Sequence, residues 1–340
     1  MNNNLQADMG TQIVVLTSSF ASRIRKDQKD NLDQARMVVD ILTGLGFEVN
    51  MVAAALDLES LSRQLDMLKP DLVFNLVEEV QGKGAFIHLP LAVLESMDIA
   101  CTGNGHLAMV MASSKLLAKK IMQAHNILTP QWLPSSGLTG KKSIQGSHIV
   151  KSVWEHGSLG LGGTSVVKEF CPAKITKKIN KLKQKYGGDW FVEAYIPGRE
   201  LNVSILETKQ GPAVLPVAEI AFEEMPRRLA RIVDYRAKWD DESISARATK
   251  RQFEFEAGDD SLLARVKNIA LKCWDVFDLS GYARVDFRVD PENIPYVLEI
   301  NTNPCLSLDS GFMSAAGQAG ISPVQVISTI VQAGFERHKQ

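Results

Sequence analysis

The sequence predicts an α/β protein in which a doubly wound parallel domain is followed by two units built on antiparallel sheets. Three observations predict this fold class. Short β-rich runs alternate with helical runs over 11–103, strands later follow one another without helices, and a stretch rich in Pro, Ser and Gly at 129–146 separates the two patterns. Alternation implies right-handed crossovers and a mainly parallel sheet, whereas consecutive strands imply antiparallel pairing.

In the first unit, strands are expected at 11–19, 47–55, 71–79 and 99–103, with helices at 31–46, 58–68 and 85–97 between them. The first helix carries an apolar stripe and ends at a pair of glycines, as a helix packed on a sheet should. The stripe consists of Leu32, Ala35, Val38, Val39 and Leu42, and the glycines are Gly44 and Gly46.

In the second part, one helix is expected at 106–126, and Val-rich strands at 147–154 and 164–170 are joined by a glycine loop. Strands at 190–196, 200–207 and 211–222 follow, then a long amphipathic helix and two further strands at 282–290 and 295–301. We expect three domains, at 1–112, 113–191 and 192–340.

Composition narrows the range of partners. The chain has 340 residues, is 45% hydrophobic and has a net charge of −1, which gives no overall field for nucleic acid or an anionic membrane. The Lys-rich run from Lys174 to Lys185 favours a helix with its lysines in solvent over a binding surface. The N-terminus has no apolar signal core, and no run of about 18 apolar residues occurs.

The four cysteines are scattered, without a Cys-x-x-Cys pair, so neither a disulfide framework nor a zinc site is indicated. We therefore expect a cytoplasmic protein.

The last two predicted strands carry polar side chains at every second position, on one face. "DPEN" at 290–293 is a turn signal, so the strands should form a hairpin with Asp286 opposite Glu299 and Arg284 opposite Asn301. Two carboxylates about 5 Å apart repel by roughly 3 kcal/mol at an effective dielectric of 20. Carboxylate and amide oxygens suit Mg²⁺, so a metal site is favoured over the alternative, a solvated face neutralised by arginines.

The loop "HGSLGLGGTS" at 156–165 offers backbone N–H groups for an anion. A Val-rich strand follows it where a dinucleotide fingerprint requires a helix. This favours a flexible lid and disfavours a Rossmann oxidoreductase. Lys151 and Lys238 are candidate phosphate ligands, although isolated lysines are usually just solvated.

"FVEAYIPGRELNVS" places Glu193 and Glu200 around a Pro-Gly turn. Such a crossover can present backbone groups to an adenine edge and a carboxylate to ribose hydroxyls; a plain hairpin turn with surface acids is the alternative. No Ser/His/Asp grouping or histidine metal spacing supports nucleophilic or zinc chemistry.

Together these pieces resemble the ATP-grasp superfamily, and most closely the D-alanine:D-alanine ligases. The resemblance runs from about residue 70 to the C-terminus. It is carried, in the family's order, by "FNLVE", "LAVLESMDIACTG", "ASSKLLAKK", "VKSVWEHGSLGL", "VEAYIPGREL", "DYRAKW", "GYARVDF" and "LEINTNP". It implies that an N-terminal pre-ATP-grasp domain precedes two ATP-grasp subdomains, with the nucleotide between two antiparallel sheets.

The resemblance also implies residue roles. Lys115 and Lys151 would bind the α- and β-phosphates and Lys238 the terminal phosphates. Glu193 and the backbone from Ala194 to Ile196 would hold adenine.

Glu200 would hold the ribose, and Asp286, Glu299 and Asn301 would hold two Mg²⁺ ions, with Mn²⁺ as an alternative. Arg284 would polarise the acyl carbonyl and stabilise the oxyanion. The implied reaction is phosphoryl transfer from ATP to a carboxylate, followed by attack of an amine on the acyl phosphate.

The departures from the family lie at the substrate end. "LTSSFASRIRKDQ", with Arg23 and Arg25, replaces a Gly-Gly turn and an acidic residue, and Val77 and Glu78 replace a His-Gly pair. In the lid, Gly157 stands where the family has the first of two serines and Ser158 is kept. Trp239 replaces a tyrosine and Cys305 an oxyanion-hole glycine, while Ser310, aligned with the serine that grips the acceptor carboxylate, is kept.

We therefore predict an ATP- and Mg²⁺-dependent ligase that joins a small carboxylate and an amine other than two D-alanines. The alternatives are a catalytically silent nucleotide-binding protein and an ATP-grasp kinase. The family also suggests a homodimer.

Overall fold

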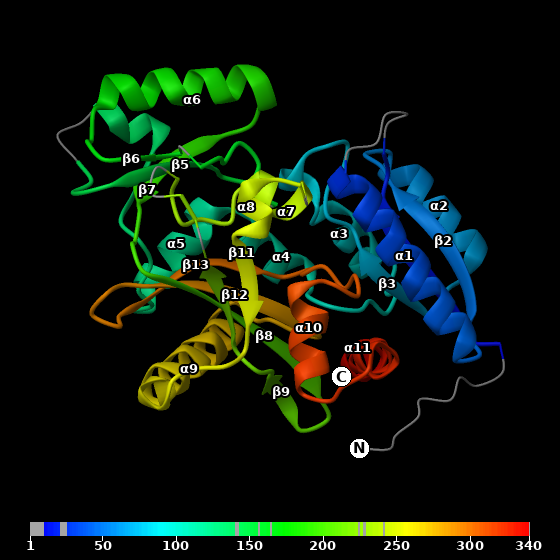
Figure 1. Ribbon diagram of the computed structural model, residues 1–340. Helices are drawn as coiled ribbons and strands as arrows, with labels where there is room; N and C mark the ends of the chain where they lie inside the picture. The colour runs from blue at the N-terminus through cyan, green and yellow to red at the C-terminus, as the bar shows by residue number, and fades with distance from the viewer. Residues whose placement is uncertain are drawn as a thin grey trace.

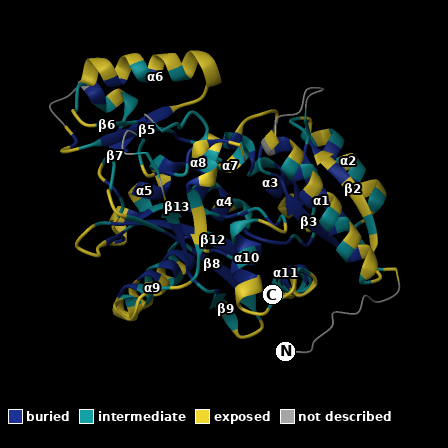
Figure 2. Cartoon of the chain, viewed as in Figure 1, coloured by how far each residue is buried: buried dark blue, intermediate teal, exposed yellow. Residues whose placement is uncertain are grey.

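The computed structural model describes residues 10–20, 26–139, 143–155, 157–163, 165–223, 225–226, 229–240 and 242–339 (Figure 1). Within these ranges the chain forms three sheets, and the mixed α/β class predicted from the sequence is confirmed. Burial is concentrated in the central strands, whereas the outer faces of the peripheral helices are exposed (Figure 2). No helix within the described ranges combines the length and apolar character needed to cross a membrane.

The N-terminal sheet is parallel, with strand order β2-β1-β3. Its helices cover both faces, because one core cluster joins β1 to α1 and another joins β1 to α2 and α3, so the doubly wound arrangement is confirmed. The strand expected at 99–103 is reduced to one parallel bridge between Cys101 and Val73. The elements are β1 (Gln12–Ser18), α1 (Lys26–Gly44), β2 (Glu48–Ala54), α2 (Leu58–Leu68), β3 (Leu72–Leu76), η1 (Gly84–Phe86) and α3 (Leu89–Ser96).

The C-terminal helix packs on this N-terminal sheet. α11 (Pro323–His338) shares a core cluster with α1 and β3, and α10 (Gly311–Gln318) precedes it. The approach is close, since a Cβ on Gly334 would lie 2.9 Å from Leu72 Cδ1. Helix α1 from the N-terminal part and helices α10 and α11 from the C-terminal part therefore share one hydrophobic core.

The single helix expected at 106–126 is wrong. The structure has α4 (His106–Ser113) and α5 (Lys115–Ala124), separated by the extended Ser114. Ser114 caps α5 by accepting a hydrogen bond from Leu117 N, and serine favours such caps over helix interiors. The break puts Lys115 at the first position of a new helix, where its backbone N–H donates to Val153 O.

A four-stranded antiparallel sheet with order β4-β7-β5-β6 follows. The strand expected at 164–170 is short, because only Val166 and Val167 pair with β5. On α6, Ile175 and Ile179 are buried and most lysines are exposed, as predicted for the Lys-rich run. The elements are β4 (Trp132–Pro134), η2 (Ser135–Thr139), β5 (His148–Ser152), β6 (Val166–Val167), α6 (Pro172–Tyr186) and β7 (Trp190–Ala194).

The six-stranded sheet has order β11-β10-β8-β12-β13, and β9 pairs with β8. Neighbouring strands of this sheet pair antiparallel, as predicted. However, β7 pairs with β5 in the four-stranded sheet, whereas β8 belongs to the six-stranded sheet, so the plain hairpin considered for Glu193 and Glu200 is wrong. The run at 211–222 forms two strands. The elements are β8 (Arg199–Thr208), β9 (Gly211–Val214), β10 (Ala218–Phe222), α7 (Tyr235–Trp239), α8 (Ile244–Arg247), β11 (Thr249–Gln252), η3 (Ala257–Asp259), α9 (Asp260–Val276), β12 (Tyr282–Val289) and β13 (Pro295–Asn301).

Candidate active site

A cavity of about 490 Å³ is lined by strands of the four-stranded and six-stranded sheets, by α7 and by loops of the N-terminal part. Its volume is in the range of small-molecule sites. Every residue proposed above for nucleotide, metal or substrate lines it, whereas Arg23 and Arg25 lie outside the described residues. The lining set comprises Lys115, Lys151, Gly157, Ser158, Glu193, Ala194, Ile196, Glu200, Lys238, Trp239, Arg284, Asp286, Glu299, Asn301, Cys305 and Ser310.

Glu193 lies between two lysines at one end of the cavity. Lys151 Nζ is 2.6 Å from its Oε1 and Lys119 Nζ is 2.8 Å from its Oε2. Burial alone would raise the pKa of Glu193, but the two ammonium groups overcome it and hold that pKa below its usual value. Glu193 is therefore an ionised, oriented carboxylate.

Lys119 is a residue that the sequence reasoning missed. Its side chain is 1% exposed and also donates to Thr129 Oγ1 at 2.7 Å. Lys119 follows Lys115 by one helical turn in "SKLLAK", so the two project from the same face of α5. That spacing was the signal that could have found it.

Lys115 lines the same cavity and contacts Glu299. Its Nζ is 3.2 Å from Glu299 Oε2 and donates to the carbonyl of Glu155 at 3.0 Å. Because the side chain is 8% exposed, the ammonium acts on the cavity with little screening. The helix break at Ser114 thus aims a cation into the site.

Lys238 comes from α7, whose N-terminus is fixed by Asp234. The carboxylate of Asp234 accepts from Ala237 N at 2.8 Å and from Ser245 Oγ at 3.3 Å. Desolvation, and then repulsion by Arg284, lowers the pKa of Lys238, although the residue is exposed. A bound anion would raise that pKa again by stabilising the charged ammonium, as expected for a phosphate ligand.

The hairpin register predicted from the sequence is confirmed at the site. Arg284 pairs with Asn301, and Asp286 pairs with Glu299. Beyond them a bulge shifts the register, so Phe287 faces Val297, and Leu298 is the extra residue. The bulge turns Leu298 into the cavity lining.

Each carboxylate oxygen of Asp286 accepts two hydrogen bonds. Arg284 donates to it twice, at 2.7 and 2.9 Å, while Asn202 and Asn301 each donate at 2.9 Å. The positive charge expected near the two carboxylates is here supplied by Arg284 and, at Glu299, by Lys115.

The oxygen donors fit a hard cation. Asp286, Glu299 and Asn301 offer two opposed carboxylates and an amide, the oxygen chemistry that Mg²⁺ prefers. Within the described ranges no group of three His, Cys, Asp or Glu side chains could hold a metal. The magnesium site stays a prediction that depends on the amide and on phosphate oxygens as further ligands.

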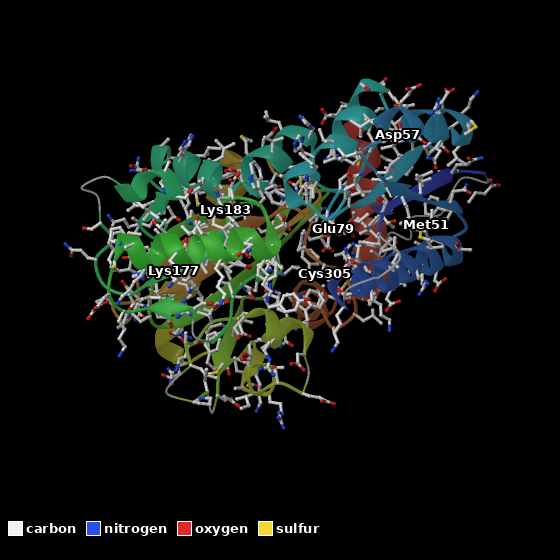
Figure 3. All side chains as sticks on the ribbon, turned by 90° about the horizontal axis from the view of Figure 1, so that it is seen from above. Met51, Asp57, Glu79, Lys177, Lys183 and Cys305 are labelled. Atoms are coloured by element: carbon white, nitrogen blue, oxygen red, sulfur yellow. The ribbon has the colours of Figure 1, made fainter. Side chains whose placement is uncertain are left out.

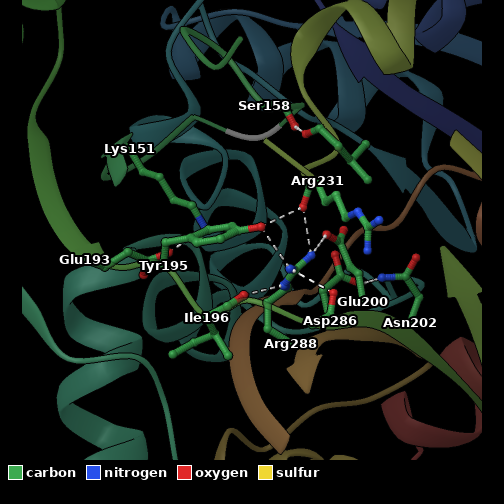
Figure 4. A network of polar contacts seen from close by, with 12 residues as sticks. Lys151, Ser158, Glu193, Tyr195, Ile196, Glu200, Asn202, Arg231, Asp286 and Arg288 are labelled. Carbon is green, nitrogen blue, oxygen red and sulfur yellow. Dashed lines mark hydrogen bonds and ion pairs between the residues drawn. The ribbon is translucent and has the colours of Figure 1, made fainter. Parts of the chain in front are cut away.

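Arg288 connects several groups around Glu200 at the cavity wall (Figure 4). Its side chain donates to Glu200 Oε2 at 3.2 Å, to the carbonyl of Ile196 at 3.0 Å and to the carbonyl of Arg231 at 3.0 Å. Burial raises the pKa of Glu200, and Arg288 opposes this. Arg288 is one of the arginines that could have neutralised the hairpin face, but the acid it pairs with is Glu200 of β8.

The glycine loop packs against the segment before α7. Ser158 Oγ donates to the carbonyl of Val233 at 2.7 Å, and Ala230 N donates to the carbonyl of Gly163 at 2.9 Å. Trp239 Nε1 donates to the carbonyl of Gly157 at 3.4 Å. The tryptophan therefore contacts the glycine loop at Gly157, where the family has a serine. His156 and Thr164 lie outside the described residues.

Cys305 lies where the N-terminal domain meets the rest of the chain (Figure 3). Its Sγ is 3.3 Å from Asp30 Oδ2 and 3.2 Å from Ser307 Oγ, and Ser307 donates to Asp30 Oδ1 at 3.0 Å. Burial and the nearby acids Glu78 and Asp30 raise the pKa of the thiol. A neutral thiol is a poor nucleophile, in agreement with the absence of a recognisable nucleophile in the sequence.

Ser310 is the N-cap of α10, where its Oγ accepts from Met313 N at 3.2 Å. Asn303, which follows the strand, accepts from the Tyr282 hydroxyl and donates to the carbonyl of Val77. The hydrogen bond from Asn303 to Val77 connects the turn after β13 to the N-terminal domain. Asp30 and Asn202 join the site from α1 and β8. Asp30 was missed because it lies in no recognisable motif, whereas Asn202 had a signal, since it follows Glu200 by two residues and so shares its face of the strand.

Comparison with known proteins gives one consistent family. Residues 143–332 match the family model "D-ala D-ala ligase C-terminus". An uncharacterized protein, y4sG, of Sinorhizobium fredii is 31% identical over 269 residues, covering 78% of this chain and 75% of its own length. A D-alanine–D-alanine ligase of Pelagibacter ubique is 28% identical, covering 95% and 98%.

Solved structures share the fold. D-alanyl-alanine synthetase A from Vibrio cholerae has a TM-score of 0.73 at 18% identity, covering 98% of this chain and 100% of that one. D-alanine–D-alanine ligase from Bacillus anthracis complexed with ATP has a TM-score of 0.71 at 20% identity, covering 97% and 99%.

Proposed function

The chain belongs to the D-alanine–D-alanine ligase family defined by that C-terminal model, and on this premise we propose that it is an ATP-dependent carboxylate–amine ligase. The observation that carries the proposal is the convergence of Lys115, Lys151 and Lys238 with Asp286 and Glu299 on one cavity. These cations and carboxylates are what phosphoryl transfer from ATP requires.

In the proposed reaction, a substrate carboxylate attacks the γ-phosphate of ATP and releases ADP. The amine then attacks the carbonyl carbon of the acyl phosphate, and phosphate leaves. Mg²⁺ bound by Asp286, Glu299 and Asn301 would neutralise phosphate charge. Neither step needs a nucleophile from the protein.

The protein side chains bind, orient and exclude water. Lys115 and Lys151 hold the α- and β-phosphates, and Lys238 holds the terminal phosphates. Arg284 uses Nε and Nη2 on Asp286, so Nη1 is left to stabilise the carbonyl oxygen as it becomes an oxyanion.

The remaining residues of the proposed site bind the nucleoside or exclude water. Glu193 and the backbone from Ala194 to Ile196 face adenine, and Glu200 faces the ribose. The lid with Gly157 and Ser158 excludes water from the acyl phosphate, which water would hydrolyse.

One substrate is a small carboxylate and the other is an amino-acid-like amine, and the two are not both D-alanine. The support is the altered donor end, where Cys305 contacts Asp30 and Trp239 contacts the lid at Gly157. We assign the enzyme to the cytoplasm, where unpaired cysteines such as these four persist. A homodimer remains a prediction from the family.

The test is incubation with ATP, Mg²⁺ and panels of acids and amines, with phosphate release and product mass as readouts. Hydroxylamine traps an acyl phosphate when the correct amine is missing. Nucleotide binding without turnover or trapping would favour a silent ATP-binding protein, and a stable phosphorylated product without an amide would favour a kinase.

An Asp286→Asn variant provides the specific control. For a ligase, turnover should collapse while the circular dichroism spectrum and the unfolding temperature stay close to those of the parent protein. Equal turnover in the two proteins would contradict the assignment.

A further inference from the structure

β11 directs a cation into the acceptor end of the cavity. Thr249 and Arg251 are two residues apart on this strand, so they share one face, and both line the cavity. Thr249 Oγ1 is buried and has no hydrogen-bond partner in the part of the chain that the structure describes. The strand therefore offers a hydroxyl and a guanidinium to a ligand.

Arg251 donates to two uncharged oxygens at the N-terminal end of α10. Its Nη1 donates to the carbonyl of Asp309 at 3.2 Å and to Ser314 Oγ at 2.9 Å. These contacts position the guanidinium without supplying a full countercharge. Its other nitrogens lie on the side of the helix N-terminus, where backbone N–H groups already favour an anion.

A second guanidinium converges on the same point. A Cβ on Gly311 would lie 3.6 Å from Arg251 Nη2, 3.7 Å from Arg251 Nε and 3.7 Å from Arg284 Nη1. Gly311 therefore leaves a space bordered by two arginines.

Among the described residues, Asp309 is the acid that acts on Arg251, which is an exposed residue of the cavity lining. Desolvation and repulsion by Arg284 lower the pKa of Arg251, and the carboxylate of Asp309 opposes them only in part. A carboxylate held by Arg251 would offset the repulsion between the two guanidiniums without a contact to Arg284, and arginine suits a carboxylate because it can donate two parallel hydrogen bonds.

The proposed function, on which this inference rests, already uses Arg284 for the acyl oxygen, and the family resemblance assigns Ser310 to the acceptor's own carboxylate. Arg251 has no part in either role. We propose that Arg251 is a specificity-determining residue that binds a second carboxylate on the acceptor amine, so that the acceptor is an acidic amino acid or a comparable dicarboxylate.

The test compares acceptors that differ in one charge at nearly equal size. With ATP, Mg²⁺ and a donor that supports turnover, kcat/KM is measured for glutamate against glutamine and for aspartate against asparagine, in both enantiomers. We expect the acidic member of at least one pair to be favoured by about tenfold or more, the size of a hydrogen-bonded charge pair.

The variant is Arg251→Met, and the matched control is Arg63→Met on α2, where Arg63 is exposed and pairs with Glu59. Arg251→Met should abolish the preference for the acidic acceptor through KM for that acceptor, while KM for ATP stays within about twofold. Arg251→Lys should restore part of the preference, since it keeps the charge but loses the paired donors. Arg63→Met should leave both parameters unchanged.

Two results would overturn the inference. One is equal use of acidic and neutral acceptors by the parent protein. The other is a rise in KM for ATP in Arg251→Met, which would assign Arg251 to the phosphates.

A binding measurement keeps this inference separate from the proposed function. Calorimetry of glutamate and glutamine, with Mg²⁺ and a non-hydrolysable ATP analogue, needs no turnover. Preferential glutamate binding that Arg251→Met removes would support the anion site even if no amide formed, whereas amide formation without any acidic preference would refute the site and leave the ligase assignment intact.

Discussion

Lys119 and Glu193 form a buried ion pair across α5 and β7, with Nζ 2.8 Å from Oε2 and each side chain 1% exposed. The pair fixes one oxygen of the carboxylate, and Lys151 takes the other at 2.6 Å. An oriented Glu193 in turn fixes Lys151 next to the proposed phosphate position. Lys119 thus acts on the nucleotide site through Glu193, as a positioning residue.

Lys119→Met should lower the free energy of unfolding by about 3 kcal/mol, because it leaves a buried carboxylate with one partner fewer. It should also raise KM for ATP. Urea unfolding and steady-state kinetics measure the two effects. Lys120→Met is the matched control, since Lys120 is the exposed neighbour on the same helix, and a similar loss in both variants would contradict the pairing.

The stability of the protein should depend on Glu193 in the acid range. The pKa of Glu193 is lowered on folding, so its stabilising contribution is present above its unfolded value of about 4.3 and is lost as the pH falls through the folded value. The unfolding temperature of Glu193→Gln should be well below that of the parent at pH 6, and the gap should narrow towards pH 3. Glu292→Gln, in the exposed hairpin turn, should show no such narrowing.

The lid should tolerate a methyl group at one glycine and not at another. Gly160 has φ of +74°, and a Cβ there would lie 2.7 Å from Trp190 Cη2, whereas a Cβ on Gly162 would meet nothing within 4 Å. Gly160→Ala should cost about 1–2 kcal/mol of backbone strain and displace the loop. Released phosphate should then exceed the amide formed, because water reaches the acyl phosphate.

Gly162→Ala should keep phosphate and amide at equal amounts. Coupled assays of both products measure the ratio. If the two alanine variants uncoupled the reaction equally, the loop would not be the barrier to water.

Cys305 should resist alkylation. Burial and the acids Glu78 and Asp30 raise the pKa of the thiol, so little thiolate forms at pH 8. Iodoacetamide should modify it at least about tenfold more slowly than a free cysteine of pKa about 8.5, as measured by peptide mass spectrometry. Rapid labelling of Cys305 would show that the thiol is exposed and ionised, with Cys305→Ser identifying the labelled peptide.

Much of the hairpin was predictable because its determinants are local. Polar residues on every second position, together with the turn at 290–293, placed Arg284 opposite Asn301 and Asp286 opposite Glu299. The bulge at Leu298 was not predicted, because residues 296–298 are apolar throughout and their sequence does not show which of them is unpaired. The break at Ser114 did have a local signal, a serine cap, but the apolar pattern continued across it.

By itself, the sequence determined the chemistry of the site and the order of its parts, since residue type, strand alternation and turn residues act over a few positions. The tertiary structure alone decided which distant parts meet. It separated β7 and β8 into two sheets, packed α11 on the N-terminal sheet, and brought Lys119 to Glu193 and Arg251 to Arg284. Such contacts depend on how whole elements bury their apolar faces against one another, and no local pattern of residues encodes that choice.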